Sequence, residues 1–403
     1  MILAIFNPGP LDPYIISLES MSRQTPDLSS SNIPGLYIHL PFCRTKCPYC
    51  AFYSETDLSF IPDFLRALFQ EMDMARNQFD RFDTVYIGGG TPSVFTSYQT
   101  EEILKRIRHN FTLAAHAEIT LEANPADINI SFLERLRDMG VNRLNLGIQS
   151  FDRKILNFLG RRHSSAQAIS AIEISRKAGF TNLGFDLIYS VPGQDMKAWL
   201  DTLSQGVAFA PEHLSCYQLT VEANTPLLTR YQKGELPFLT EGLQYDFFIK
   251  TSEQLEDAGY AHYEVSNFSR GIEYASRHNQ KYWDHTPYLG LGPSAHSFSG
   301  NRRWWNHRNL EDYINELSLR NAPIQAAETL SPEQLRLEAL FLALRTSAGL
   351  HLKDFSEKFQ YDLLLEKGET LAKLQEEGRV TIRDGILYPT RSGLAIADSL
   401  ALI

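Results

Sequence analysis

The chain has 403 residues, of which 43% are hydrophobic, and a formal net charge of −10. This length suffices for one large domain and a smaller one, and the negative charge argues against broad electrostatic binding to nucleic acid or anionic lipid. Four cysteines, three of them clustered, do not match the disulfide framework of a secreted protein. Since no apolar run approaches the roughly 18 residues that span a bilayer, we expect a soluble cytoplasmic protein.

Residues 1–35 are rich in Pro, Ser and Asn, as in RQTPDLSSSNIPG, and lack a lasting hydrophobic periodicity. This composition predicts a disordered N-terminal extension. Its first residues, MILAIFNPGP, hold a short apolar run without a basic flank, which makes a poor signal peptide. Met21 is an alternative candidate for the start of the protein.

Between residues 36 and 223, short apolar runs alternate with amphipathic stretches of helical periodicity. The runs are LYIHLPF, TVYIGGG, EITLEAN, RLNLGIQSF, LGFDLIYSVPG and HLSCYQLTVE. This alternation predicts an α/β fold with a parallel sheet covered by helices, and six such units predict a partial (β/α)6 TIM-type barrel. Polar or glycine-rich residues follow nearly every run, so we expect them to share one pocket at the C-terminal ends of the strands.

The remainder of the chain divides into two regions. Residues 224–324 form an aromatic-rich extension that contains HNQKYW and RRWW. In residues 325–403, SPEQLRLEALFLAL opens with good helix-start residues, two further helices follow at HLKDFSEKF and TLAKLQEEG, and Asp384-Gly385 marks a hairpin. This order predicts a C-terminal winged-helix-like domain. Its acidic excess favours a docking or capping module over DNA binding.

Cys43, Cys47 and Cys50 lie within eight residues of each other, directly after a predicted strand. Clustered thiolates can hold zinc or an iron–sulfur centre. Structural zinc usually takes four protein ligands, but Cys216 lies in an apolar strand-like run where a buried thiol is ordinary, and His39 is expected to point away from the cysteine loop. Three thiolates suit a [4Fe–4S] cluster that keeps one iron open for a ligand.

Several polar residues at predicted strand ends are candidates for binding that ligand. The glycines of GGGTPS, residues 88–93, let backbone approach a ligand closely, although a plain turn would also use glycine. Glu122 could accept hydrogen bonds from the ligand or cap a helix. Gln149 and Asp186 need polar partners, either a ribose or buried backbone groups. Arg161 could pair with a ligand carboxylate or form a surface ion pair.

These motifs resemble the radical S-adenosylmethionine (SAM) superfamily. From about residue 36 to the end, the chain looks like a coproporphyrinogen III dehydrogenase-type member, through YIHLPFCRTKCPYCAF, GGGTPS, LEANP, LGIQSF, GRRH and DLIYSVPGQ. In that superfamily three cysteines hold the cluster, the open iron binds SAM, and an electron from the cluster cleaves the sulfonium to a 5′-deoxyadenosyl radical. The resemblance implies that SAM contacts Tyr37, Tyr49, Gly89, Gly90, Thr91, Glu122, Gln149, Arg161 and Asp186.

Phe52 stands where the family's dehydrogenases carry a fourth motif cysteine. Together with HNQKYW, this resembles the heme chaperone branch, which implies heme binding, an acceptor protein for the heme, and an electron donor. A histidine is a usual axial ligand of heme iron, so His278 is the expected ligand; a packed strand or turn with a satisfied histidine is the alternative. The resemblance implies a heme site of His278, Asn279, Tyr282 and Trp283. RRWW could meet the propionates or form an exposed hairpin.

Three functions remain open at this point. The first is a heme chaperone with a radical-type cluster, and the second is an oxygen-independent coproporphyrinogen III dehydrogenase, against which Phe52 argues. The third is a scaffold that keeps the cluster for structure only, against which the polar strand-end residues argue. We assign no catalytic residue, and the sequence leaves open whether SAM is cleaved.

Overall fold

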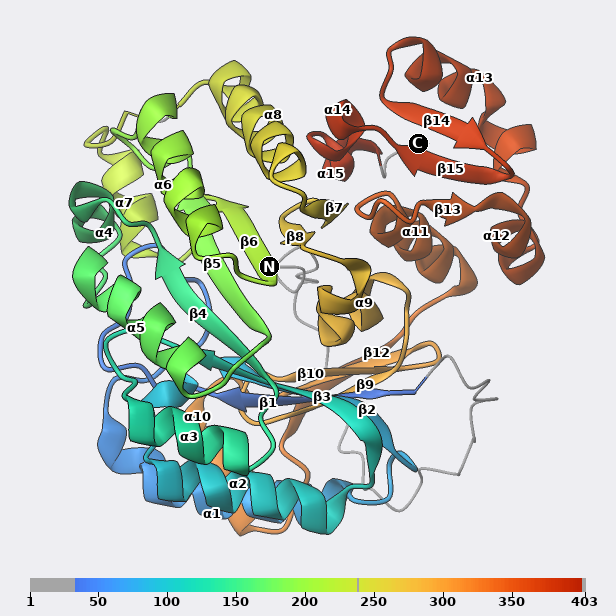
Figure 1. Ribbon diagram of the computed structural model, residues 1–403. Helices are drawn as coiled ribbons and strands as arrows, with labels where there is room; N and C mark the ends of the chain where they lie inside the picture. Colours follow the sequence, from blue (N-terminus) through green and yellow to red (C-terminus); the bar gives the residue numbers. More distant parts are fainter. Residues whose placement is uncertain (1–32, 238, 401–403) are drawn as a thin grey trace.

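The computed structural model describes residues 33–237 and 239–400 (Figure 1). Residues 1–32, including Met21 and nearly all of the predicted disordered extension, lie outside the described residues. Among the described residues, no helix has both the length and the apolar character to cross a membrane.

Six parallel strands, neighbours in chain order, form the centre of the molecule. They are β1 (Gly35–Leu40), β2 (Phe82–Gly89), β3 (Leu113–Ala123), β4 (Arg143–Gln149), β5 (Leu183–Tyr189) and β6 (His213–Gln218). The helices between them are α1 (Ile61–Ala75), α2 (Ser97–Asn110), α3 (Ile130–Asp138), α4 (Arg153–Phe158), α5 (Ser165–Lys177) and α6 (Met196–Ala208). The predicted partial barrel is confirmed, and each strand overlaps its predicted apolar run, although β3 begins five residues earlier, at Leu113. The short α4 was not predicted.

The helices cover the outer face of the curved sheet (Figure 1). Alternate residues of β1, such as Leu36, Ile38 and Leu40, are fully buried in the same core as Phe64 and Leu68 of α1. Because side chains alternate along a strand, the intervening residues of β1 face the inner side of the sheet, which we call the lumen. Helix starts are fixed locally, for example by the capping boxes at the N termini of α2 and α5.

The aromatic-rich segment, together with residues 325–329 of the predicted C-terminal region, continues the same sheet at both edges. Beyond β1 lie β9 (Tyr288–Leu291), β10 (His296–Ser299), β11 (Arg302–Asn306) and β12 (Ile324–Thr329), and beyond β6 lie β8 (Asn267–Ser269) and β7 (Ala261–Glu264). The helices of this segment are α7 (Pro226–Gln232), α8 (Glu241–Asp257), α9 (Arg277–Trp283) and α10 (Leu310–Ser318). RRWW lies in strand β11, which forms a hairpin with β10 and also pairs with β12. The hairpin is therefore confirmed, but it is not an exposed one, because Trp304 is buried in the main core.

The C-terminal region has its own small core and a three-stranded sheet. Its elements are α11 (Pro332–Ala343), β13 (Leu350–His351), α12 (Leu352–Phe359), α13 (Leu363–Glu376), β14 (Val380–Arg383), β15 (Ile386–Pro389), α14 (Arg391–Leu394) and α15 (Ala397–Leu400). The hairpin turns at Asp384 and Gly385, both with positive φ, as its tight turn requires. The winged-helix-like order is confirmed. An ion pair between Arg303 of β11 and Glu338 of α11, at 2.8 Å, links this region to the large sheet.

Candidate functional site

The three clustered cysteines lie in the loop that leaves the C-terminal end of β1, and their thiols are free. The loop is held from two sides. The Cys43 amide donates to the Glu55 carbonyl at 2.8 Å, and the Thr91 amide, from the turn after β2, donates to the Phe42 carbonyl at 2.8 Å. The cysteine loop and the turn after β2 therefore form one hydrogen-bonded unit at the end of the lumen.

The thiols have the environment of cluster ligands. The Cys43 sulfur lies 3.2 Å from the Thr91 hydroxyl, and Arg161 Nη1 lies 3.5 Å from the Cys47 sulfur. Burial raises the pKa of the Cys43 and Cys50 thiols, so a positive partner is needed to hold them as thiolates. Within the described ranges, no three His, Cys, Asp or Glu side chains converge on one metal ion. Three thiolates would hold three irons of a cube, one each, and would leave the fourth iron for another ligand.

The two other candidate zinc ligands lie elsewhere. Cys216 is on β6 in the main core and only 2% exposed, which confirms a buried structural thiol. His39 is also buried, and both its ring nitrogens have partners, the Tyr37 hydroxyl at 3.0 Å and the Tyr53 carbonyl at 3.2 Å. Burial lowers the pKa of His39 to about 4. Neither residue completes a four-ligand zinc site.

The three consecutive glycines are explained by contacts within the protein, because other protein atoms lie where their side chains would be. A side chain on Gly88 would begin 2.9 Å from the Glu122 carboxylate, and one on Gly90 would begin 2.7 Å from the Phe42 carbonyl and 2.8 Å from the Leu40 carbonyl. Gly89 has a φ of 105°, a conformation that favours glycine. These glycines thus let the turn after β2 dock on the cysteine loop. Their contact with SAM stays a prediction.

Two partly buried carboxylates point into the lumen. Glu122, on β3, accepts a 2.6 Å hydrogen bond from the Tyr86 hydroxyl, and Asp186, on β5, accepts one of 2.8 Å from the Asn145 amide. Burial raises the pKa of Glu122 to about 7, against the lowering effect of the Tyr86 hydrogen bond, and burial also raises the pKa of Asp186. The helix-cap alternative for Glu122 is wrong. Both groups can accept hydrogen bonds from a cationic or hydroxylated ligand.

Gln149 and Arg161 meet beside the cysteine loop. Gln149 ends β4 with a φ of 65°, and its buried side-chain oxygen has no hydrogen-bond partner. Arg161 donates to the Gly147 carbonyl at 2.8 Å and reaches Cys47, so the surface ion pair considered for it is wrong. The positive φ of Gln149 and its unpaired buried oxygen both lower the stability of the fold. A bound ligand that donates a hydrogen bond to this oxygen would offset part of that cost.

Two residues of the segment after β5 were not singled out from the sequence. The Ser190 hydroxyl and the Gln194 side-chain nitrogen are buried without hydrogen-bond partners, and Ser190 has a φ of 58°. Their only signal in the sequence is a general one, polar residues after an apolar run. With Gln149 and Arg161, these residues give the strand ends a set of unpaired polar atoms. The chain's own donors and acceptors therefore fit SAM beside a three-thiolate cluster.

The two predicted tyrosines lie at different positions along the lumen. Tyr49 is within the cysteine loop, and burial raises its pKa. Tyr37, on β1, faces the lumen and has ring contacts with Tyr86 and His278. The structure therefore gathers the predicted SAM residues around the lumen and the ends of its strands. They are Tyr37, Tyr49, Gly89, Gly90, Thr91, Glu122, Gln149, Arg161 and Asp186.

HNQKYW forms helix α9, neither the strand nor the turn considered for it. His278 is 1% exposed, and its ring nitrogens contact the Thr84 hydroxyl at 2.8 Å and the Tyr282 hydroxyl at 2.9 Å. Thr84 and Gly89 are five residues apart on β2, about 17 Å, so α9 occupies the lumen end opposite the cysteine loop.

The other predicted heme residues belong to the same packed helix. Trp283 contacts Tyr263 and shares a buried cluster with Leu342 of α11, while the Asn279 amide takes part in the helix cap formed by Ser276. An axial role for His278 stays a prediction, and it requires α9 to move because both ring nitrogens are engaged.

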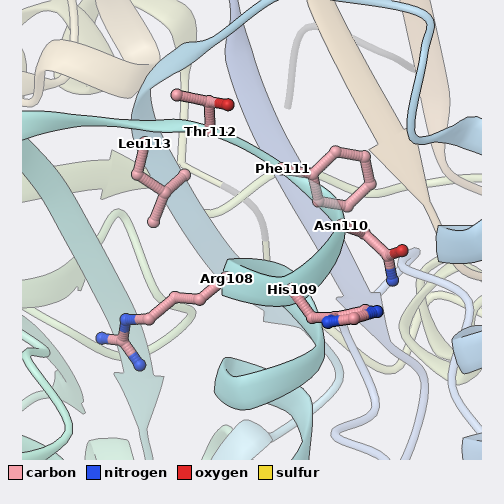
Figure 2. A pocket seen from close by; sticks show the side chains of 6 residues that line it. All are labelled: Arg108, His109, Asn110, Phe111, Thr112 and Leu113. Carbon is pink, nitrogen blue, oxygen red and sulfur yellow. The ribbon is translucent and has the colours of Figure 1, made fainter.

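A hollow at the C-terminal end of α2 lies away from this site. Figure 2 shows six consecutive residues around it, from the last turn of α2 to the start of β3: Arg108, His109, Asn110, Phe111, Thr112 and Leu113. The start of β3 is at the end of the sheet opposite the cysteine loop. This hollow brings no residues together from distant parts of the chain and contains none of the predicted site residues.

Comparison with known proteins agrees with this geometry. Residues 37–205 match the radical SAM superfamily, and residues 330–396 match the HemN C-terminal domain. The chain is 31% identical to the heme chaperone HemW of Bacillus subtilis, over 90% of this chain and 97% of that protein. The chain belongs to the HemW family of radical SAM proteins.

Two further comparisons extend this assignment. HemW of Mycobacterium tuberculosis is 36% identical over 79% of this chain and 83% of its own length. The mitochondrial radical S-adenosyl methionine domain-containing protein 1 of Bos taurus is 32% identical over 91% of this chain and 86% of its own length. The solved coproporphyrinogen III oxidase (HemN) of Escherichia coli has a TM-score of 0.81 at 23% identity, over 92% of this chain and 90% of that one. It shares the fold.

We predict that Cys43→Ser, Cys47→Ser or Cys50→Ser each abolishes the [4Fe–4S] cluster, because each removes one of three thiolate ligands. Iron and sulfide content and the absorption spectrum after anaerobic reconstitution measure this. Cys216→Ser is the matched control and should retain the wild-type cluster. Loss of the cluster in Cys216→Ser alone would show that the ligand set is wrong.

We predict that Gln149→Leu weakens SAM binding about five- to tenfold, the cost of one hydrogen bond of about 1–1.5 kcal/mol. Cluster content should not change, and the free energy of unfolding should not fall, because the variant removes an unpaired buried oxygen. Equilibrium dialysis and urea unfolding measure the two quantities. Gln375→Leu is the control, because Gln375 is exposed on α13. A destabilised Gln149→Leu with normal SAM affinity would make the role of Gln149 structural.

Proposed function

We propose that the protein is a heme chaperone, which binds heme and passes it to an acceptor protein, and that it carries a [4Fe–4S] cluster and SAM. The observation that carries the proposal is the three-cysteine loop with Phe52 in the fourth position, in a chain whose curated relatives are named heme chaperone HemW. The match to the Bacillus subtilis protein covers 90% of this chain and 97% of that protein, so the similarity extends over nearly the whole of both sequences.

In this proposal, Cys43, Cys47 and Cys50 hold three irons and leave the fourth for SAM. When bound, the cluster supplies a reducing electron and a Lewis-acidic iron. The protein orients SAM and excludes water. Glu122 and Asp186 accept hydrogen bonds from its ribose or ammonium group, and Arg161 offsets negative charge beside Cys47.

Phe52 argues against the dehydrogenase alternative. Its side chain is 51% exposed at the mouth of the lumen, so the place of the fourth motif cysteine holds an apolar ring without thiol chemistry. The similarity to the HemN structure concerns the fold alone, at 23% identity. The chaperone function therefore accounts for this chain better than coproporphyrinogen chemistry.

The proposal includes a protein acceptor for the heme, a separate electron donor for the cluster, and a location in the cytoplasm. A formal net charge of −10 favours partners with basic docking surfaces.

The test uses the full chain, reconstituted anaerobically with iron and sulfide. We predict saturable binding of about one heme per chain, transfer of that heme to an apo heme protein, and no conversion of coproporphyrinogen III to protoporphyrinogen IX with SAM and reductant. Absorption spectroscopy follows the heme, and chromatography follows the porphyrins. Turnover of coproporphyrinogen III, or failure to bind heme, would overturn the proposal.

A further inference from the structure

One carboxylate outside the predicted SAM residues joins distant segments of the chain around the cysteine loop. Asp127 lies in the turn after β3, and its side chain is only 4% exposed. Its Oδ1 atom accepts a hydrogen bond from Arg44 Nε at 3.3 Å, and its Oδ2 atom accepts one from Arg162 Nη2. The two arginines are 83 and 35 residues away from Asp127 in the sequence. This carboxylate therefore makes a bridge that exists only in the folded protein.

Both arginines belong to segments that carry or touch the thiols. Arg44 lies in the spacer between the first two cysteines of the loop. Arg162 directly follows Arg161, whose Nη1 atom lies 3.5 Å from the Cys47 sulfur. Asp127 thus connects the spacer of the cysteine loop to the segment that contacts one of its sulfurs.

The same two segments also pack directly against each other. Gly160, which precedes Arg161, has a φ of 64°, a conformation that favours glycine. A side chain on Gly160 would begin 2.8 Å from the ring of Pro48, between the second and third cysteines. The segment is therefore held against the loop at two points, by packing at Pro48 and through Asp127 at Arg44. Two points fix an orientation that one contact would leave free.

The turn that carries Asp127 is itself held in place. The Asp127 amide donates to the Asn124 carbonyl at 2.9 Å, and the Ala126 amide donates to the Asn124 side-chain oxygen at 3.0 Å. The Asn124 amide donates to the Ser93 hydroxyl at 3.0 Å. Ser93 belongs to the GGGTPS turn, which docks on the cysteine loop. Asp127 therefore closes a ring of contacts that begins and ends at this loop.

The charges of this bridge have an electrostatic consequence for a bound cluster. A carboxylate that is almost fully shielded from water needs partners to replace its hydration, and two guanidinium groups supply charge-assisted hydrogen bonds. The potential of an iron–sulfur cluster depends on nearby charges and hydrogen bonds. A negative charge beside the cluster disfavours the reduced form, because reduction adds one more electron. Asp127 thus offsets the positive charge of Arg44 and Arg162 near the cluster.

We propose that Asp127 is a positioning residue for the iron–sulfur cluster. By holding Arg44 and Arg162, it fixes the path of the cysteine loop before the cluster binds, and its charge lowers the reduction potential of the bound cluster. It does so through the two arginines, without touching iron or SAM. This inference rests on the cluster of the proposed function and does not depend on heme transfer.

The test compares the full-length wild type, Asp127→Asn, Asp127→Glu and Asp138→Asn, each reconstituted anaerobically with iron and sulfide. Asp138 is exposed at the end of α3 and serves as the matched control. The rate of iron loss to a coloured chelator and the midpoint potential from a redox titration are measured. We expect Asp127→Asn to lose iron at least about tenfold faster, as changes in the outer contacts of metal sites commonly do, and to have a more positive potential.

The other variants separate positioning from folding. Asp127→Glu keeps the carboxylate and should retain the wild-type potential, and Asp138→Asn should match the wild type in both measurements. Arg44→Gln should also lose iron faster, but its potential should become more negative, because it removes a positive charge. Urea unfolding of each protein without its cluster reports the stability of the fold.

Three results would overturn this role. The first is a wild-type rate of iron loss and a wild-type potential in Asp127→Asn. The second is a potential that shifts in the same direction in Asp127→Asn and Arg44→Gln. The third is a lower free energy of unfolding in Asp127→Asn with an unchanged potential, which would make the bridge purely structural. Absence of a cluster in the reconstituted wild type would instead refute the cluster on which the inference rests.

Discussion

The docking of the turn after β2 onto the cysteine loop is the constraint on which the site depends. The amides of Gly90 and Thr91 donate to the Leu40 and Phe42 carbonyls, each at 2.8 Å. These short contacts are open only to a residue without a side chain at position 90. They fix the direction in which Cys43 leaves β1 and bring the Thr91 hydroxyl to its sulfur. A loop carrying three thiols is thereby held at one end of a lumen whose other end is filled by α9.

The lumen combines carboxylates and imidazoles that are shielded from solvent to different degrees. Burial raises the pKa of both Glu122 and Asp186, which means that their charged forms are poorly solvated. A sulfonium ligand with an ammonium group would relieve this cost. Burial lowers the pKa of His39 to about 4 and that of His278 to about 3, so both imidazoles are neutral near pH 7. The carboxylates of the lumen can therefore accept hydrogen bonds from a cationic ligand.

The local pattern predicted the six strands, the hairpin at Asp384-Gly385 and the single thiol loop, because each depends on periodicity or spacing within a short segment. Contacts between distant segments were not predictable in this way. HNQKYW becomes helix α9, which is capped locally by Ser276 and held by Glu118 of the distant β3, which accepts from the Arg277 and His278 amides.

The central claim is that three cysteines hold a cube and leave one iron open to SAM in a heme chaperone. The most direct measurement is Mössbauer spectroscopy of the protein reconstituted with iron-57, recorded with and without SAM. The account predicts that one iron of four changes its isomer shift and quadrupole splitting when SAM is added, while the three thiolate-bound irons do not. Four irons that remain equivalent with SAM present would contradict it.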